Sequence, residues 1–127
     1  MQSLCETILA GKNAMEAREW LQTVRKRGFA LVTLGELSST EESLALVNKA
    51  YAAGAVRVTA VEVVEYPAFG SQNKGKLSQN TGKLVIELPD DEPERADALA
   101  WAGAIAEEQG FDAETDTGQR YVFVMLD

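Results

Sequence analysis

Residues 55–88 read AVRVTAVEVVEYPAFGSQNKGKLSQNTGKLVIEL and predict two strands joined by a long excursion rich in glycine and lysine. The first strand is Ala55–Glu65, and the second is the apolar run Lys83–Leu88. The excursion, Pro67–Gly82, is longer than an ordinary hairpin loop. Turn signals recur in it, because Asn and Gly both tolerate a positive φ. The other predicted elements are arranged about this pair of strands.

A strand and a helix flank the pair on each side. Upstream, Phe29–Leu34 is apolar on both faces, as in a central strand, and Thr40–Ala53 is a capped helix. Downstream, Glu92–Gln109 is a second capped helix, and Gln119–Leu126 is a closing strand. The order β-α-β-β-α-β is that of the ferredoxin-like split βαβ sandwich. We therefore predict an α+β, two-layer fold whose antiparallel sheet has the order 4-1-3-2, with both helices on one face.

Two segments extend this predicted core. In residues 1–28, Asn13 and Glu16 have capping-box spacing, so a helical extension is expected before Gly28. Near the other end, Phe111–Glu114 is compatible with a short strand that adds a C-terminal hairpin. A chain of 127 residues has the size of one domain, so we assign 1–127 to a single domain with its core in 29–127.

The composition excludes several classes of function. The chain has one cysteine, Cys5, and no histidine, which removes internal disulfides, the common Cys/His zinc sites and Ser-His-Asp catalysis. The net charge of −8 opposes binding to nucleic acid and to anionic membranes. No basic leader and no apolar run of membrane-spanning length is present. We therefore expect a soluble cytoplasmic protein with no metal, no cofactor, no nucleic-acid partner and no membrane partner.

The excursion 67–82 is the most positive part of this acidic chain. Between Glu65 and Glu87 there are three lysines and no acidic residue. One interpretation is a flap that binds an anion or a protein partner, with Gln72, Lys74 and Lys76 as candidate ligand-binding residues. The other interpretation is a solvated, extended β-ribbon. The absence of apolar periodicity predicts that this excursion is the least protected part of the folded protein.

A family resemblance adds two more candidate residues. The strand Val58–Val63, the segment Phe69–Gly75 and the strand that ends before Asp90 together resemble the PII signal-protein pattern of strand, T-loop entry and capped second helix. Gly118 and Arg120 are similarly placed to the glycine and the basic residue before that family's last strand. The resemblance implies a regulatory plait that docks through the loop between its second and third strands, here residues 67–82, with Gly118 and Arg120 as further ligand-binding candidates.

The closing strand 119–126 is apolar on both faces. Phe123 and Met125 point to one face, and Val122 and Val124 point to the other. A plait covers only one sheet face with its helices, so the other face requires a cover. We expect a homo-oligomer, a dimer or a trimer, to bury it. The alternative is that the N-terminal helix covers it within one chain, through Met15, Trp20, Leu21 and Val24.

These patterns leave more than one function open. The favoured hypothesis is a non-enzymatic ligand-sensing or regulatory binding module that uses the 67–82 loop. The alternative is a homo-oligomeric interaction or assembly module without a small-molecule ligand. A third hypothesis is an enzyme that uses the carboxylates Glu62 or Glu65 beside Tyr66 for acid-base chemistry. The residues expected in the core are Phe29, Leu31, Val56, Val58, Leu84, Ile86, Leu99, Ile105 and Phe123.

Overall fold

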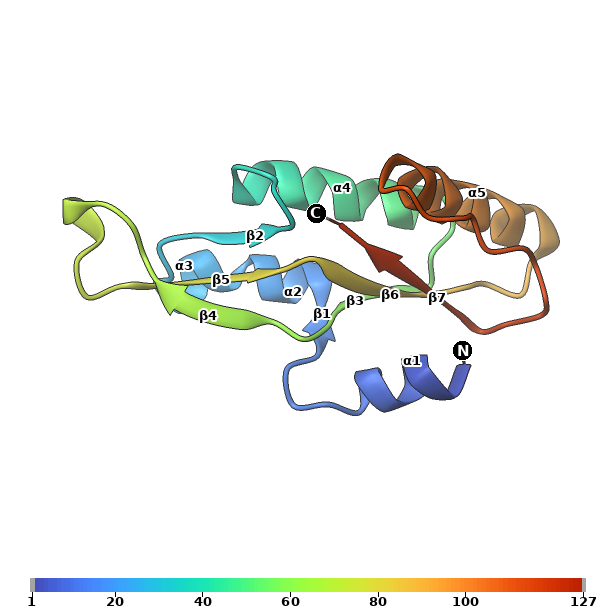
Figure 1. The fold of residues 1–127 in the computed structure, drawn as a ribbon, viewed down its shortest axis with the longest axis horizontal. Coiled ribbons are helices and arrows are strands. Elements are labelled where there is room, and N and C mark those ends of the chain that lie inside the picture. Colours follow the sequence, from blue (N-terminus) through green and yellow to red (C-terminus); the bar gives the residue numbers. More distant parts are fainter. Residues whose placement is uncertain (1, 127) are drawn as a thin grey trace.

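The structure, a computed structural model, describes residues 2–126, and the side chains of residues 4–126. It is a mixed α+β fold with two sheets, drawn out along one axis (Figure 1). The helices are α1 (Gln2–Leu9), α2 (Ala17–Leu21), α3 (Thr23–Lys26), α4 (Thr40–Ala52) and α5 (Glu92–Glu108), with a 3-10 turn η1 (Ser71–Asn73). The strands are β1 (Met15–Glu16), β2 (Val32–Leu34), β3 (Arg57–Ala60), β4 (Val64–Pro67), β5 (Leu77–Thr81), β6 (Lys83–Glu87) and β7 (Tyr121–Met125).

One long hairpin runs through both sheets. β3 and β4 form its first half, β5 and β6 form its second half, and the two halves pair antiparallel. The first sheet has the order β1-β3-β6-β7, and the second has the order β2-β5-β4. The first half of the hairpin passes from one sheet to the other at Glu62, which has a positive φ of 53°. A left-handed backbone at a non-glycine residue is uncommon and breaks regular pairing, so the strand bends there.

The second half of the hairpin passes from one sheet to the other at Gly82. The Gly35 amide donates to the Thr81 carbonyl (2.8 Å), and the Leu126 amide donates to the Gly82 carbonyl (2.6 Å). β2 runs parallel to β5, and β7 runs antiparallel to β6, so these two short strands meet end to end beside Gly82. The sequence-predicted order 4-1-3-2 is not found, because β2 occupies a sheet edge and does not lie between two strands.

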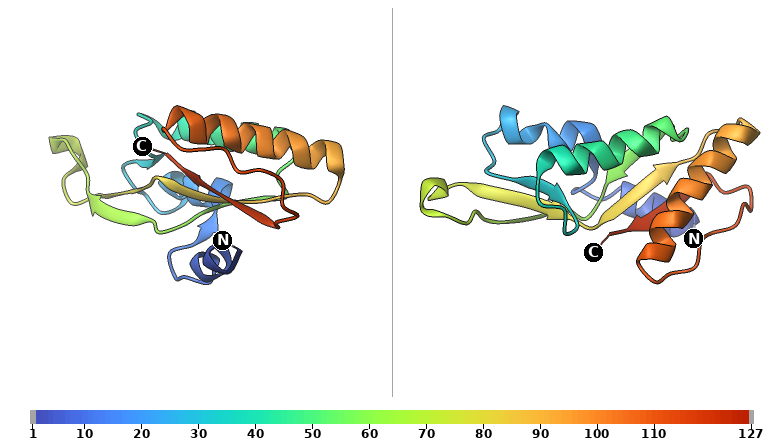
Figure 2. Two further views of the ribbon diagram at one scale, coloured as in Figure 1. Left: turned by 45° about the vertical axis from the view of Figure 1, so that its right-hand side comes forward. Right: turned by 90° about the horizontal axis from the view of Figure 1, so that it is seen from above.

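The expected helices on one sheet face are confirmed. α4 and α5 lie on the same side of the sheets (Figures 1 and 2). Ser39 caps α4 by accepting a hydrogen bond from the Glu42 amide (3.1 Å), and Asp91 caps α5 by accepting one from the Glu94 amide (3.2 Å). Each cap satisfies a backbone donor that the first helical turn leaves unpaired.

The N-terminal residues do not form the expected covering helix. Trp20 and Leu21 are almost fully buried in the main core beside α4, and Met15 and Val24 pack against the same core. The opposite face is covered by α1, where Cys5 packs on Val61 and Val85. The interpretation that residues 15–24 cover this face was therefore wrong, although a cover from the N-terminal segment was right. Periodicity identified the buried stripe but not the sheet face that it contacts.

The predicted core residues are mostly confirmed, whereas the predicted C-terminal hairpin is not found. Val58, Leu84, Ile86 and Ile105 are buried, and Phe29, Leu31, Leu99 and Phe123 are half-buried. Val56 was expected in the core but is 54% exposed, because β3 begins one residue later at the rim of the sheet. Phe111–Glu114 is not a strand, so the additional C-terminal hairpin is absent. This segment instead runs past α5, where Gly103 lets Ala113 approach closely.

Candidate functional site: a projecting hairpin arm

The end of the long hairpin projects from the body of the protein (Figure 1). We call residues 64–81 the arm and residues 68–76 its tip. Backbone and side-chain hydrogen bonds order the tip: the Ala68 amide donates to the Lys76 carbonyl (3.1 Å), and the Asn73 side-chain amide donates to the Phe69 carbonyl (2.8 Å). Gly70 supplies the positive φ at which the 3-10 turn begins. The tip is therefore a shaped turn that presents its side chains in a defined arrangement.

The arm exposes large apolar side chains. Phe69 is 84% exposed at the tip, Val64 is 58% exposed, and Leu77 is 41% exposed. The rings of Phe69 and Tyr66 lie near each other, with centroids 6.2 Å apart and an interplanar angle of 45°. Aromatic side chains are enriched at protein interfaces because they bury a large area at a small loss of rotamer entropy. The neighbouring rings of Phe69 and Tyr66 are therefore the part of the arm best suited to an interface.

The charge of the tip differs from that of the chain. Gln72, Lys74 and Lys76 lie on the tip and are exposed, as expected of candidate binding residues. Lys83 is not part of this charge, because its ammonium group pairs with the Glu62 carboxylate at the bend of the hairpin. Two lysines beside an exposed aromatic ring make the tip a cationic and apolar feature on a chain of net charge −8.

The segment outside the strands of the hairpin is shorter than the predicted excursion 67–82. Residues 77–81 form β5, the central strand of the second sheet, which pairs with β2 on one side and β4 on the other. Ser78 and Thr81 are buried, and the Thr81 hydroxyl donates to the Val61 carbonyl (2.6 Å). The polar side chains of β5 do not form a hydrophobic pattern, although the buried Thr81 hydroxyl is satisfied by the Val61 backbone carbonyl.

Gly118 and Arg120 precede β7, which begins beside Glu87 at the end of β6 that is remote from β5 and the tip. The Arg120 guanidinium contacts the Glu87 carboxylate (3.3 Å) and lies 5.2 Å from the centroid of the Tyr121 ring. The Gly118 amide donates to the Asp116 carboxylate (3.0 Å) in a turn. The structure thus does not bring the five predicted binding residues together, and they do not form one pocket.

The turn around Gly118 is held by a charged network. Arg95 on α5 donates to both carboxylate oxygens of Asp116, at distances of 2.8–3.0 Å, and to the Gln119 carbonyl (2.7 Å). The hydrogen bond from Arg95, and then the bond from the Gly118 amide, lower the pKa of Asp116 below its ordinary value. These contacts fix the connection from α5 to β7, so we interpret the network as structural.

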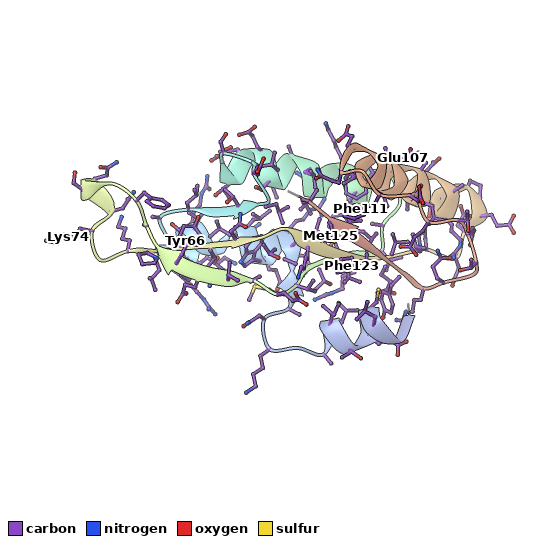
Figure 3. The ribbon with its side chains drawn as sticks, in the orientation of Figure 1. Tyr66, Lys74, Glu107, Phe111, Phe123 and Met125 are labelled. Atoms are coloured by element: carbon purple, nitrogen blue, oxygen red, sulfur yellow. The ribbon has the colours of Figure 1, made fainter. Side chains whose placement is uncertain are left out.

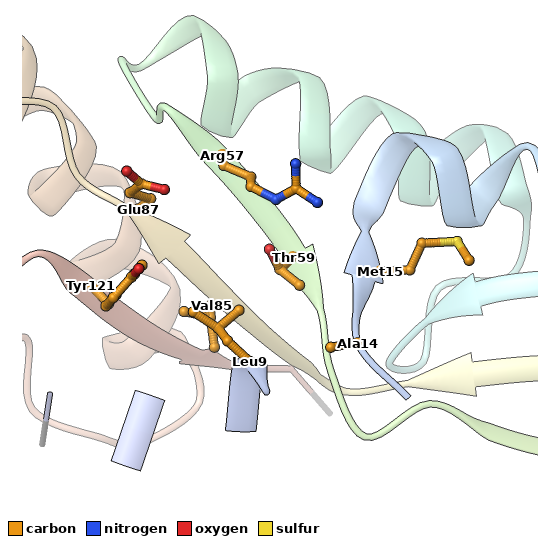
Figure 4. A pocket seen from close by; sticks show the side chains of 8 residues that line it. All are labelled: Leu9, Ala14, Met15, Arg57, Thr59, Val85, Glu87 and Tyr121. Atoms are coloured by element: carbon orange, nitrogen blue, oxygen red, sulfur yellow. The ribbon is translucent and has the colours of Figure 1, made fainter. Parts of the chain in front are cut away.

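A hollow of about 230 Å³ lies between α1, β1 and the first sheet (Figure 4). The cross-strand row formed by Arg57, Glu87 and Tyr121 borders it, and the floor includes Thr59 and Val85. Arg57 and Glu87 carry opposite charges, and Glu87 is already paired with Arg120. The hollow therefore presents no uniform field for an ionic ligand.

The carboxylates considered for acid-base chemistry do not converge. Glu62 pairs with Lys83 at the bend, and Glu65 accepts a hydrogen bond from the Gln79 side-chain amide (3.2 Å). Tyr66 follows Glu65 in the same strand, so their side chains point to opposite faces. In the described part of the chain, no group of three acidic or cysteine side chains is placed to hold a metal ion. Over the same residues, no helix combines the length and the apolar character needed to cross a membrane.

The structure also contains a groove that the sequence did not predict. An apolar groove of about 180 Å³ lies between α5, the segment 111–114 and β7. Phe111 and Met125, which are 52% and 40% exposed, form part of its wall (Figure 3). The sequence signal for this groove is Phe111, an aromatic residue in a segment of polar residues, but the sequence pattern assigns it to a strand.

Comparison with known proteins gave no match, since no protein-family model, no curated protein and no solved structure is significantly similar to this chain.

Proposed function

We propose that the protein is a non-enzymatic binding module that docks on a protein surface through the tip of its arm. The observation that carries this proposal is Phe69, an aromatic side chain that is 84% exposed on an ordered, projecting turn. Its ring lies near the Tyr66 ring, and most of the side chain remains in contact with solvent. Burying such a side chain contributes about 1.5–3 kcal/mol to association, so the position suits an interface anchor.

The order of the tip supports the same proposal. Association is weakened when a loop must lose freedom on binding, and a preformed turn reduces that loss. The hydrogen bonds of Ala68 and Asn73 already fix the backbone around Phe69. Lys74 and Lys76 would then add attraction to an acidic partner surface and favour one orientation of docking. The resemblance to PII signal proteins also implies docking through the loop between the second and third strands of the plait, which corresponds to residues 67–82 here.

A photo-crosslinking amino acid placed at position 69 tests this function in cells. The matched control carries the same amino acid at Val56, which is also exposed but lies just before β3, away from the arm. We expect crosslinked protein adducts from position 69 that are absent from position 56. Equal adducts from both positions, or none from either, would contradict a docking function for the arm.

A small anion is the alternative ligand for the tip, because Lys74 and Lys76 are exposed cations with no acidic residue between Glu65 and Glu87. Thermal-shift measurements with inorganic phosphate and a nucleotide panel separate the two functions. A ligand-dependent rise in melting temperature that is lost in Lys74→Gln but kept in Phe69→Ala would support anion binding. No shift with any of these ligands would favour docking on a protein.

A further inference from the structure

We propose that the arm docks in the groove between α5, segment 111–114 and β7 of a second copy of this chain. This inference rests on the proposed docking function of the arm and names its partner. Each copy carries one arm tip and one groove, so each copy both donates Phe69 and receives it. Figure 3 labels Tyr66 and Lys74 on the arm, and Phe111 and Met125 at the groove.

The groove has the size and the lining of a site for one phenyl ring. Its volume is about 180 Å³. For comparison, an apolar protein cavity of about 150 Å³ binds benzene. Leu99, Ala102, Ala106, Phe111, Val122 and Met125 are among the side chains that line it. A ring inserted there replaces contact with water by contact with aliphatic and aromatic side chains.

The charges of the two surfaces are complementary. Asp112 and Glu114 line the groove. The exposed Glu107 lies on the last turn of α5, where the Phe111 amide donates to the Ala106 carbonyl (2.8 Å). No basic residue lines the groove, and no salt bridge within residues 2–126 involves these three carboxylates. Lys74 and Lys76 lie on the same tip as Phe69, where the Ala68 amide donates to the Lys76 carbonyl. An inserted Phe69 would therefore bring two cations to an acidic rim that the chain's own cations leave unpaired.

The distance between the tip and the groove means that the tip of one copy must bind the groove of another copy. Lys74 and the tip lie at one end of the long axis, whereas Phe111 and Glu107 lie over α5 in the other half (Figures 1 and 3). A short ordered arm cannot fold back over that separation, so a chain does not fill its own groove. Because the donating and receiving surfaces differ, the contact is heterologous and closes only as a reciprocal pair or as a ring.

Complementation between two variants tests this contact. Phe69→Glu disables the tip and keeps the groove, and Met125→Glu disables the groove and keeps the tip. The matched control, Val56→Glu, adds the same charge at an exposed position outside both surfaces. We expect the wild type and Val56→Glu to sediment as assemblies at high micromolar concentration, and each of the two variants alone to sediment as a 13.8 kDa monomer. An equimolar mixture of the two variants should form a 1:1 complex, because one intact tip and one intact groove remain.

A charge reversal gives a second readout if Met125→Glu lowers stability. Lys74→Glu with Lys76→Glu turns rim attraction into repulsion and should weaken self-association by about tenfold or more. A chain with Asp112→Lys and Glu114→Lys should bind the reversed tip and restore the complex. Circular dichroism and melting temperature confirm that every variant is folded.

Three outcomes would overturn the inference. The wild type could be strictly monomeric, the mixed variants could fail to form a complex, or Phe69→Glu could leave self-association intact. The crosslinking experiment separates these failures from failure of the arm's function. Adducts from position 69 to a different protein would retain the docking function and reject the second copy. A lack of adducts would reject both.

Discussion

Tyr51 shows how single side chains join the elements of the main core. Its hydroxyl donates to the Glu16 carboxylate (2.6 Å) and accepts from the Val58 amide (3.0 Å). The Arg18 guanidinium covers the ring at 4.0 Å from its centroid. One residue of α4 thereby ties β1 and α2 to β3. These contacts are partly buried, so losing the hydroxyl leaves polar groups without a partner.

The first prediction concerns Tyr51→Phe. The free energy of unfolding should fall by about 1–3 kcal/mol, because the Val58 amide loses its acceptor and Glu16 loses its donor. Urea denaturation measures this change. Tyr66→Phe on the arm, outside these contacts, is the matched control and should leave the free energy of unfolding nearly unchanged. Equal losses in both variants would contradict the assigned role of Tyr51.

The same residue gives a prediction for pH. Burial, and then the hydrogen bond to Glu16, raise the pKa of Tyr51 above its ordinary value of 10.0. The folded state then holds the proton to a higher pH than the unfolded state. The contribution is complete below pH 10 and is lost as the pH rises through the folded pKa. Wild type should therefore lose more stability than Tyr51→Phe between neutral pH and about pH 11, as measured by urea denaturation. A parallel loss in both proteins would contradict this.

Gly82 marks the junction of the two sheets at the level of one residue. A Cβ atom there would lie 2.4 Å from the Leu126 carbonyl oxygen, closer than real Cβ contacts come. We predict that Gly82→Ala displaces the end of β7 and lowers the free energy of unfolding by about 1–3 kcal/mol. The amide of Leu126 should exchange faster with solvent. Gly75→Ala adds a methyl group where nothing lies within 4 Å, so it should leave Leu126 exchange unchanged.

At the scale of elements, the arm combines a rigid base with a separate tip. β5 is bonded on both sides, whereas the tip 68–76 has only its own short hydrogen bonds. We predict that amides of residues 77–81 are protected from hydrogen exchange, and that tip amides without a backbone acceptor exchange fast, because the bonds that order the tip do not bury it. Replacing residues 69–75 with an Asn-Gly turn should keep the melting temperature within a few degrees and abolish self-association. A large loss of stability would show that the tip is part of the folding core.

For the whole molecule, self-association must overcome repulsion between chains of net charge −8. In the proposed contact, attraction between the tip lysines and the acidic groove opposes that repulsion, and salt screens both. The Lys74→Gln, Lys76→Gln variant keeps only the repulsion. Its dissociation constant should therefore fall more steeply with added NaCl than that of the wild type, as measured by sedimentation. Identical salt dependence in the two proteins would contradict a role for the lysines.

Part of the candidate site was predictable from residues close together in the sequence. The lysines and turn glycines of residues 70–76 indicated an exposed, cationic excursion, and the structure places them on the arm tip. The extent of the excursion was overestimated, since Ser78 and Thr81 are polar and resemble loop residues, although both are buried in β5 and the Thr81 hydroxyl bonds to the Val61 carbonyl. The groove was not predictable, because α5 and β7 form it only after Gly103 lets Ala113 approach.

The sequence by itself determined the elements governed by local chemistry. Capping at Ser39 and Asp91 placed α4 and α5, since a cap satisfies amides only a few residues away. Apolar runs identified β6 and β7. The tertiary structure alone decided which surfaces meet: the division into two sheets at Gly82, the edge position of β2, and the choice of α1 to cover the second face. Each depends on contacts between distant residues, such as Gly82 with Leu126, and a periodic pattern shows that a face is buried without showing what buries it.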